Sequence, residues 1–253
     1  MGADRTAPPL AGRRIVVTRS EADNRSLAAG LSALGATVVE VPLVEVKPSI
    51  DGGRALAEAA AVLSTYRWVV LTSTSGVRAL ADALGGKTWP DGVAVAPVGP
   101  ATEAAARAAG FTTIAPPPTA TAHNLVASFP VSHGPADRQV LAPLAELAGD
   151  TVVAGLTAKG YRVRRVTAYR TADPGETGPA DLTAADAVLF FSPSVVDRFL
   201  ARFGSSAVPP VVVCVGPSTA ARAGERDLAG IVTASPHTEA GVVDAVCHVL
   251  EHR

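Results

Sequence analysis

Short apolar runs alternate with alanine-rich segments along the whole chain. The apolar runs at 15–17, 68–71 and 211–214 are each followed by a polar turn and then by a segment suited to an α-helix. Runs of this length between turn residues are typical of buried strands. Strands that alternate with helices predict parallel sheets covered by helices on both faces, which is an α/β fold.

The remaining elements follow the same pattern. The helix after Ser20 ends at Gly35, and the extended stretch 41–48 is bracketed by prolines, which favours a connector or an edge strand. The other expected strands lie at 37–41, 92–96, 112–115, 140–141, 188–191 and 231–233. The other expected helices lie at 54–63, 77–84, 123–128 and 239–250, and one more runs from the turn at 99–102 to Arg107.

One turn motif occurs twice. Val-Gly-Pro-Ala-Thr at 98–102 returns as Val-Gly-Pro-Ser-Thr at 215–219, each time between an apolar run and an alanine-rich segment. Glycine accepts unusual backbone angles, proline suits the first helical turn, and Ser or Thr can cap the exposed amides. Such a turn directs backbone N–H groups and the positive end of a helix dipole at a ligand. The two copies indicate a duplicated architecture that faces one ligand.

The duplication extends beyond this turn. Segment 27–35 reappears as 152–160, the strand and turn at 69–75 as those at 188–194, and 113–128 as 231–250. The extended stretches 41–47 and 163–171 occupy the same place in the two repeats, so we expect them to lie side by side. Composition alone would instead divide the chain once, near Gly134 in the Pro- and Gly-containing stretch 129–137.

Composition excludes several classes of protein. The 253 residues are 48% hydrophobic with a net charge of −1, which argues against a general nucleic-acid binder or a basic membrane-surface protein. No apolar run approaches the roughly 18 residues that span a bilayer. Cys214 and Cys247 lack metal-ligand spacing and the five histidines are scattered, so we expect a cytoplasmic protein without a zinc site.

Two kinds of function are compatible with these turns taken by themselves. The first is a two-domain α/β enzyme for a phosphorylated ligand, although neither Gly-Pro turn is a P-loop or a GxGxxG turn. The second is a binding module without catalytic activity that closes on a small anionic ligand. No Ser-His-Asp, Cys-His or paired-carboxylate arrangement is visible in the sequence.

The ordered set of motifs resembles the uroporphyrinogen-III synthase family. The motifs are Val-Thr-Arg at 17–19, the hydroxyl-rich turn at 72–75, the two Val-Gly-Pro turns, Ser-Pro-Ser at 192–194 and Val-Thr-Ala-Tyr-Arg-Thr at 166–171. Each motif alone is poorly specific, but together they cover the chain from about Arg14 to Leu250. The resemblance implies two similar parallel-sheet α/β domains joined by a two-stranded β-ribbon. Domain 1 would combine 1–41 with 172–253, domain 2 would be 49–163, and 42–48 and 164–171 would be linker strands.

The resemblance also implies an activity. Members of the family are lyases of haem, sirohaem and cobalamin biosynthesis that convert hydroxymethylbilane into uroporphyrinogen III without a cofactor. Water is lost, ring D attacks through its substituted carbon, and a spiro intermediate recloses with the ring inverted. Tyr169 matches the family's tyrosine beside the cleft and is the expected proton donor to the departing hydroxyl. We expect a monomer that binds neither nucleic acid nor membrane; a transient contact with hydroxymethylbilane synthase stays open.

The substrate carries acetate and propionate groups, so the resemblance directs attention to amide donors, hydroxyls and arginines. The expected substrate-binding residues are Arg19, Thr72, Ser73, Ser75, Gly99, Thr102, Arg164, Arg170, Ser192, Ser194, Gly216, Ser218 and Thr219. Any one hydroxyl of this set fits a plain helix cap as well as it fits a ligand contact. The arginines at 164, 165 and 170 also fit a strand face that is exposed to solvent. This chain has Leu144 where family members often have arginine, which puts one carboxylate contact in doubt.

Overall fold

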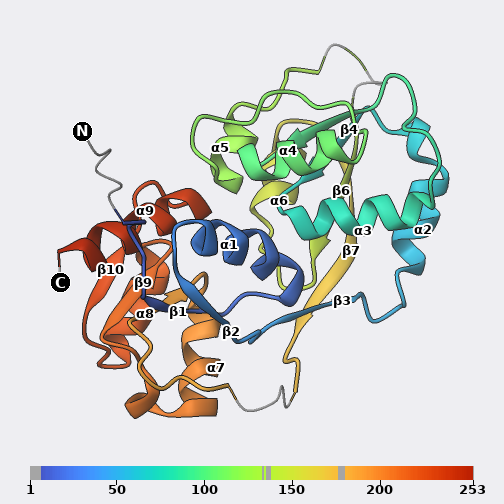
Figure 1. The fold of residues 1–253 in the computed structure, drawn as a ribbon. Coiled ribbons are helices and arrows are strands. Elements are labelled where there is room, and N and C mark those ends of the chain that lie inside the picture. The colour runs from blue at the N-terminus through green and yellow to red at the C-terminus, as the bar shows by residue number, and fades with distance from the viewer. Residues whose placement is uncertain (1–6, 133, 135–137, 176–179, 253) are drawn as a thin grey trace, which may run out of the picture. The chain divides into compact units, whose positions relative to one another are not determined.

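The computed structural model describes residues 7–132, 134, 138–175 and 180–252. The chain forms two compact units, which we call unit 1 (Met1–Glu45 and Ala172–Arg253) and unit 2 (Val46–Thr171). Blue, orange and red segments make up unit 1 in Figure 1, and cyan to yellow segments make up unit 2. The chain therefore passes from one unit to the other twice, at points that lie within strands β3 and β7.

Unit 1 is built on a parallel sheet with the strand order β10-β9-β8-β1-β2. Its strands are β1 (Arg14–Val17), β2 (Thr37–Glu40), β8 (Ala187–Phe190), β9 (Val211–Cys214) and β10 (Ile231–Thr233). Its helices are α1 (Glu21–Ala33), α7 (Pro193–Phe203), α8 (Pro217–Glu225) and α9 (Glu239–Glu251), with a short 3-10 turn, η3 (Ser205–Ala207).

Successive residues of β1 point into two separate cores, as expected for a strand buried on both faces. Ile15 and Val17 pack with side chains of α1 and α9, whereas Val16 packs with α7 and α8. One face of the sheet is thus covered by α1 and α9 and the other by α7 and α8.

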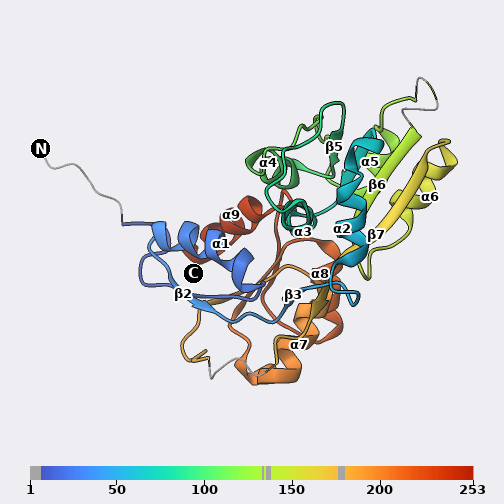
Figure 2. The same ribbon diagram turned by 90° about the vertical axis from the view of Figure 1, so that its right-hand side faces the viewer.

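Unit 2 repeats this plan with the strand order β3-β7-β6-β4-β5. Its strands are β3 (Glu45–Pro48), β4 (Trp68–Leu71), β5 (Ala94–Pro97), β6 (Gln139–Ala145) and β7 (Arg162–Ala172). Its helices are α2 (Arg54–Ala61), α3 (Thr74–Leu84), α4 (Pro100–Ala108), α5 (Ala122–Ala127) and α6 (Thr151–Ala158), with a 3-10 turn, η1 (Leu63–Thr65). In Figure 2, β6 and β7 lie between α2 and α6. Side chains of α2, α3 and α4 pack on one face of the sheet and those of α5 and α6 on the other.

The α/β class, the parallel pairing and the alternation of strands and helices agree with the sequence-based prediction. The two extended stretches are neighbours, because β3 is the edge strand beside β7. The predicted strand at 112–115 is wrong: only Thr113 forms an isolated bridge, with Val95. Residues 116–118 are all proline and have no N–H, so the ladder cannot continue.

Strand β6 is longer than the predicted 140–141, although Pro143 lies in its interior. In the part of the chain that the structure describes, β6 pairs with β4 only at Val140 and Leu141, whereas its pairing with β7 continues to Ala145. Pro143 therefore lies where one side of β6 has no partner strand, which is where a proline is tolerated in a sheet.

Candidate functional site

In unit 2, two of the predicted turns follow neighbouring parallel strands. Thr72 and Ser73 come after β4, and Val98 and Gly99 come after β5, with the Val98 amide bonded to the Leu71 carbonyl at 2.9 Å. The carboxyl ends of parallel strands are the usual ligand-binding edge of an α/β sheet. Ser73 caps α3, because its Oγ accepts from the Gly76 amide at 3.0 Å.

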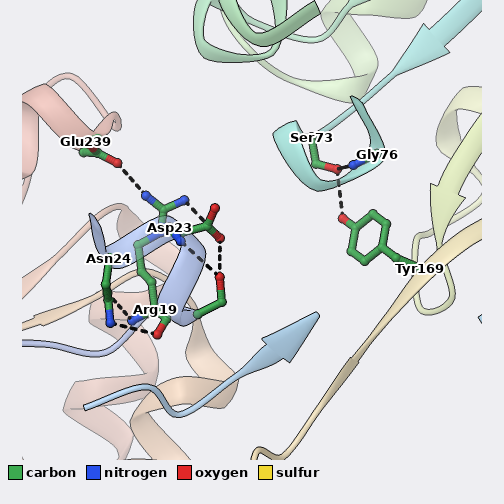
Figure 3. Close-up of polar contacts among 8 residues, drawn as sticks. Arg19, Asp23, Asn24, Ser73, Gly76, Tyr169 and Glu239 are labelled. Atoms are coloured by element: carbon green, nitrogen blue, oxygen red, sulfur yellow. Dashed lines mark hydrogen bonds and ion pairs between the residues drawn. The ribbon is translucent and has the colours of Figure 1, made fainter. Parts of the chain in front are cut away.

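Tyr169 lies at this same edge. Its register partner is Ala145, the last residue of β6, and its half-buried ring packs against the core beneath α2, α3 and α4. The phenol oxygen is 2.9 Å from Ser73 Oγ, as Figure 3 shows. The structure thus brings the expected proton donor and one expected hydroxyl into direct contact, although 96 positions separate them in the sequence.

The turn after β5 differs from the turn after β4, because it has no side-chain cap and a neighbouring loop covers it. Gly99 begins α4 with Pro100 in its first turn, and no side chain caps the helix amides. A Cβ on Gly99 would lie 2.6 Å from the Cβ of Ala120, so the loop before α5 covers this turn closely. Thr102 is only 4% exposed and Ser75 only 8%, so both hydroxyls belong to the interior of the turns, whereas Thr72 is half-buried.

In unit 1, Arg19 follows β1 and is held on several sides. Its guanidinium bonds to Glu239 at 2.5 Å, lies 3.8 Å from the Asp23 carboxylate, and stands 4.7 Å above the centre of the Phe191 ring. The buried Asn24 side chain accepts from the Arg19 amide and donates to its carbonyl, both at 3.1 Å (Figure 3). The sequence pointed to Arg19 as a candidate but gave no sign of these partners.

Helices α7 and α8 begin at the same edge of the unit 1 sheet. Ser192 and Gly216 are their N-cap residues, each followed by proline, and neither helix has a side-chain cap or an acidic residue in its first turn. By contrast, α1 and α9 are capped by Ser20 and Thr238 and carry acidic residues in their first turns. A helix that begins with neither a side-chain cap nor an acidic residue leaves its first-turn N–H groups and the positive end of its dipole available to bind an anion.

The other expected contacts of unit 1 differ in exposure. Thr219 is 1% exposed, so its hydroxyl faces the interior of the turn. Ser218 and Ser194 are exposed, and Ser194 Oγ lies 3.2 Å from that of Ser192.

The structure does not bring every predicted residue to these edges. Arg164 is level with Leu141 and donates to the hydroxyl of Tyr66 at 3.2 Å, toward the amino end of the unit 2 strands. Arg170, in contrast, directly follows Tyr169 near the carboxyl end of β7. It is half-buried, and its Nε has no hydrogen-bond partner among the described residues. Leu144 is fully buried in β6, so this position offers no charge for a carboxylate.

The titratable groups near these edges offer no thiol nucleophile. Burial raises the pKa of Cys214, at the end of β9, to about 11, so its thiol stays protonated near neutral pH. Within the described ranges, no three His, Cys, Asp or Glu side chains are grouped so that they could hold a metal ion. None of the helices in the described part of the chain has the length and apolar character of a membrane span.

Comparisons with known proteins agree with one another. The family model described as "Uroporphyrinogen-III synthase HemD" matches residues 25–244. The chain is 33% identical over 172 residues to a uroporphyrinogen-III synthase of Synechococcus elongatus, covering 66% of this chain and 64% of that protein. It is 28% identical over 234 residues to the porphyrin biosynthesis protein HemD of Ruminiclostridium josui, covering 88% of this chain and 46% of that protein. The chain thus spans less than two thirds of the length of either relative.

Solved structures show the same fold. A mutant uroporphyrinogen III synthase from Thermus thermophilus is 17% identical with a TM-score of 0.57, and the match covers 96% of this chain and 100% of that one. The Helicobacter pylori uroporphyrinogen-III synthetase is 13% identical with a TM-score of 0.61, and the match covers 94% of this chain and 99% of that one.

Proposed function

Because this chain belongs to the uroporphyrinogen-III synthase family, we propose that it cyclises hydroxymethylbilane to uroporphyrinogen III, with loss of water and inversion of ring D. One observation carries the proposal beyond family membership. The Tyr169 phenol stands at the carboxyl edge of the unit 2 sheet, fixed at 2.9 Å by the hydroxyl that caps α3. A phenol held in this way can give a proton to a departing hydroxyl.

The chemistry needs little from the protein besides this proton. The pyrrole nitrogen of ring A supplies the electron pair that expels the hydroxyl, and the Tyr169 proton leaves with that hydroxyl as water. Ring D then attacks through its substituted carbon, and the spiro intermediate opens and recloses with ring D turned over. Aromatisation releases one proton, which restores the phenol. The remaining task is to hold a flexible chain in one reactive shape and to exclude water.

The carboxylates of the substrate fit the uncapped helix starts. The start at Gly99 is covered by the loop before α5 and carries Glu103 in its first turn. The starts at Ser192 and Gly216, by contrast, offer first-turn amides with neither a side-chain cap nor an acidic residue. Hydrogen bonds from backbone amides to carboxylates are charge-assisted and about twice as strong as neutral ones. We propose that these amides, together with the exposed hydroxyls of Ser194 and Ser218, bind acetate and propionate groups.

We assign Arg19 the same type of ligand. Its guanidinium is oriented by Glu239, by Asp23 and by the Phe191 ring, and its remaining N–H groups can donate charge-assisted hydrogen bonds to a substrate carboxylate. Arg164 is not included in the proposed site, because it points to Tyr66 at the other end of the strands.

The protein is further proposed to act as a cytoplasmic monomer without a cofactor, with at most transient contact with hydroxymethylbilane synthase. The unpaired thiols of Cys214 and Cys247 suit a reducing compartment. Light scattering tests the monomer, because a mass of twice 25.5 kDa would contradict it. Dialysis against a strong chelator tests whether the activity is independent of a metal cofactor. Activity that is lost on dialysis and restored by zinc would contradict that part of the proposal.

The test of the function uses hydroxymethylbilane itself. Spontaneous ring closure of this compound gives the symmetric type I isomer, whereas the proposed enzyme gives type III. Freshly prepared substrate is incubated with the protein, the product is oxidised, and the isomers are separated chromatographically. Type III as the main product supports the proposal, and type I alone, at the rate seen in buffer, contradicts it.

A further inference from the structure

We infer that Ser73 is a positioning residue that directs the hydrogen of the Tyr169 phenol toward the substrate, rather than a residue that binds substrate. The inference rests on the proposed function and concerns one hydrogen bond within unit 2. Ser73 Oγ contacts two groups: the Gly76 amide at 3.0 Å and the Tyr169 hydroxyl at 2.9 Å.

The number of available hydrogens limits how this pair can be arranged. Ser73 Oγ has one hydrogen and two acceptor sites, and the Gly76 N–H occupies one acceptor site. Either Ser73 donates to Tyr169, which leaves the phenol hydrogen available, or Tyr169 donates to Ser73 and its hydrogen is used. Only the first arrangement leaves the phenol proton itself available to the substrate.

The helix start favours the first arrangement. An oxygen that accepts a hydrogen bond becomes a better donor through its own O–H, because hydrogen bonds in a chain polarise one another. The Gly76 amide belongs to the first turn of α3, where the positive end of the helix dipole further polarises the Ser73 hydroxyl. The hydrogens therefore run in one direction, from Gly76 N–H through Ser73 O–H to Tyr169 O–H and on to the leaving hydroxyl.

The backbone around Ser73 keeps this chain of hydrogen bonds in place. Gly76 is buried, and a Cβ there would lie 3.3 Å from Ser73 Oγ and 3.4 Å from the Pro143 carbonyl oxygen. Glycine thus lets the first turn of α3 approach both the Ser73 hydroxyl and β6. On the other side, Tyr169 is held by its packing against the core and by β7, whose residue 169 carbonyl accepts from the Glu146 amide at 2.9 Å.

This arrangement also matters after the proton has left. As the phenol oxygen gains negative charge, the Ser73 hydrogen bond to it strengthens, since hydrogen bonds to the charged form of a group favour that form. Ser73 therefore acts on the rate of the chemical step and not on substrate affinity. A serine that held a substrate carboxylate would instead act on KM.

The experiment compares kcat and KM for Ser73→Ala, Tyr169→Phe and the double variant, in initial-rate assays with the isomers resolved. Ser73→Ala is expected to lower kcat by about 2- to 12-fold, the net worth of one hydrogen bond, with KM unchanged. Tyr169→Phe is expected to lower kcat by about 10- to 100-fold, near the low end for general acids, because a pyrrole-assisted ionisation is easy. The double variant is expected to match Tyr169→Phe, since Ser73 acts through the phenol.

Three further variants separate positioning from folding. Ser73→Thr keeps the hydroxyl and is expected to restore kcat. Ser73→Gly removes the hydroxyl but is nearly as good an N-cap as serine, so it reports on the same hydrogen bond if the alanine variant does not fold. Thr121→Ala is the matched control, because Thr121 caps α5 of the same unit through the Asn124 amide at 3.1 Å; it is expected to lower Tm without lowering kcat.

Each contrary result has its own meaning. A raised KM with unchanged kcat in Ser73→Ala, or losses that multiply in the double variant, would overturn the role of Ser73. Wild-type kcat in Tyr169→Phe would also overturn it, because Ser73 would then have no proton donor to direct. Wild-type protein that yields only the type I isomer would remove the proposed function itself, whatever the variants do.

Discussion

The two Val-Gly-Pro turns have nearly the same sequence but different surroundings, and Gly99→Ala exposes the difference. Gly99 and Gly216 have φ of −166° and −165°, an extended backbone that any residue adopts, so an added methyl group acts only through its contacts. At Gly99 that Cβ would lie 2.6 Å from the Ala120 Cβ, closer than real Cβ contacts come. At Gly216 the nearest atom, His237 Cγ, would be 3.6 Å away, an ordinary contact.

The expected cost follows from this geometry. Overpacking of a closed site costs about 1–3 kcal/mol, and in a chain of this size each kcal/mol shifts Tm by roughly 2–4 °C. Gly99→Ala should therefore lower Tm by roughly 2–12 °C. Gly216→Ala should change Tm by no more than about 2 °C, as for a substitution that costs at most about 0.5 kcal/mol. Thermal unfolding followed by far-ultraviolet circular dichroism measures both shifts.

A second substitution tests the cause. Ala120→Gly removes the opposing methyl group, so Gly99→Ala should cost much less in that background than in the wild type. Equal Tm shifts for the two glycine variants would refute the steric explanation. An undiminished cost of Gly99→Ala in the Ala120→Gly background would refute it as well.

Three other predictions concern charge and burial. Hydrogen bonds from Arg222 lower the pKa of Asp197 below its ordinary 3.8, so its stabilisation is complete above that value and lost as the pH falls through the folded pKa. Asp197→Asn should thus lower Tm at pH 7, and the difference from wild type should shrink as the pH falls below 3.8; a difference that stays constant with pH would contradict this. Arg19→Ala should raise KM about 10- to 150-fold and change kcat little, because it removes about 1.5–3 kcal/mol of hydrogen bonding to a charged group. An unchanged KM would remove Arg19 from the site. Thr219→Ala should lower Tm and leave KM within about threefold, because a side chain 1% exposed offers little to a ligand; a larger rise in KM would show that its hydroxyl binds substrate.

Periodicity and turn chemistry identified most of the fold from the sequence. Buried strands such as Trp68–Leu71 and Val211–Cys214 are short, apolar and bounded by turns, so local sequence is sufficient to find them. Strand lengths were predicted less well, because 112–115 forms only one bridge among the described residues whereas β6 continues past 140–141 through Pro143. The effect of a proline's missing N–H depends on which strand lies beside it, and among the described residues only β7 pairs with β6 at Pro143.

The contacts of the candidate site were less accessible from the sequence. The family resemblance pointed to Ser73 and Tyr169 separately, but their hydrogen bond depends on how β4, β6 and β7 are ordered in the sheet. The pairing of Arg19 with Glu239 joins the first βα turn of the chain to its last helix. No local signal marks such a pair, since a glutamate in the first turn of a helix is common for electrostatic reasons alone.

The most direct measurement of the central claim is the isomer ratio of uroporphyrinogen formed from hydroxymethylbilane at increasing protein concentration. Spontaneous closure and the catalysed reaction compete for the same substrate, so the type III fraction should rise from near zero in buffer toward complete conversion as protein is added. Heat-denatured protein should give the buffer result. A type III fraction that stays at the buffer level at every protein concentration, with protein shown to be folded, would contradict the proposed activity.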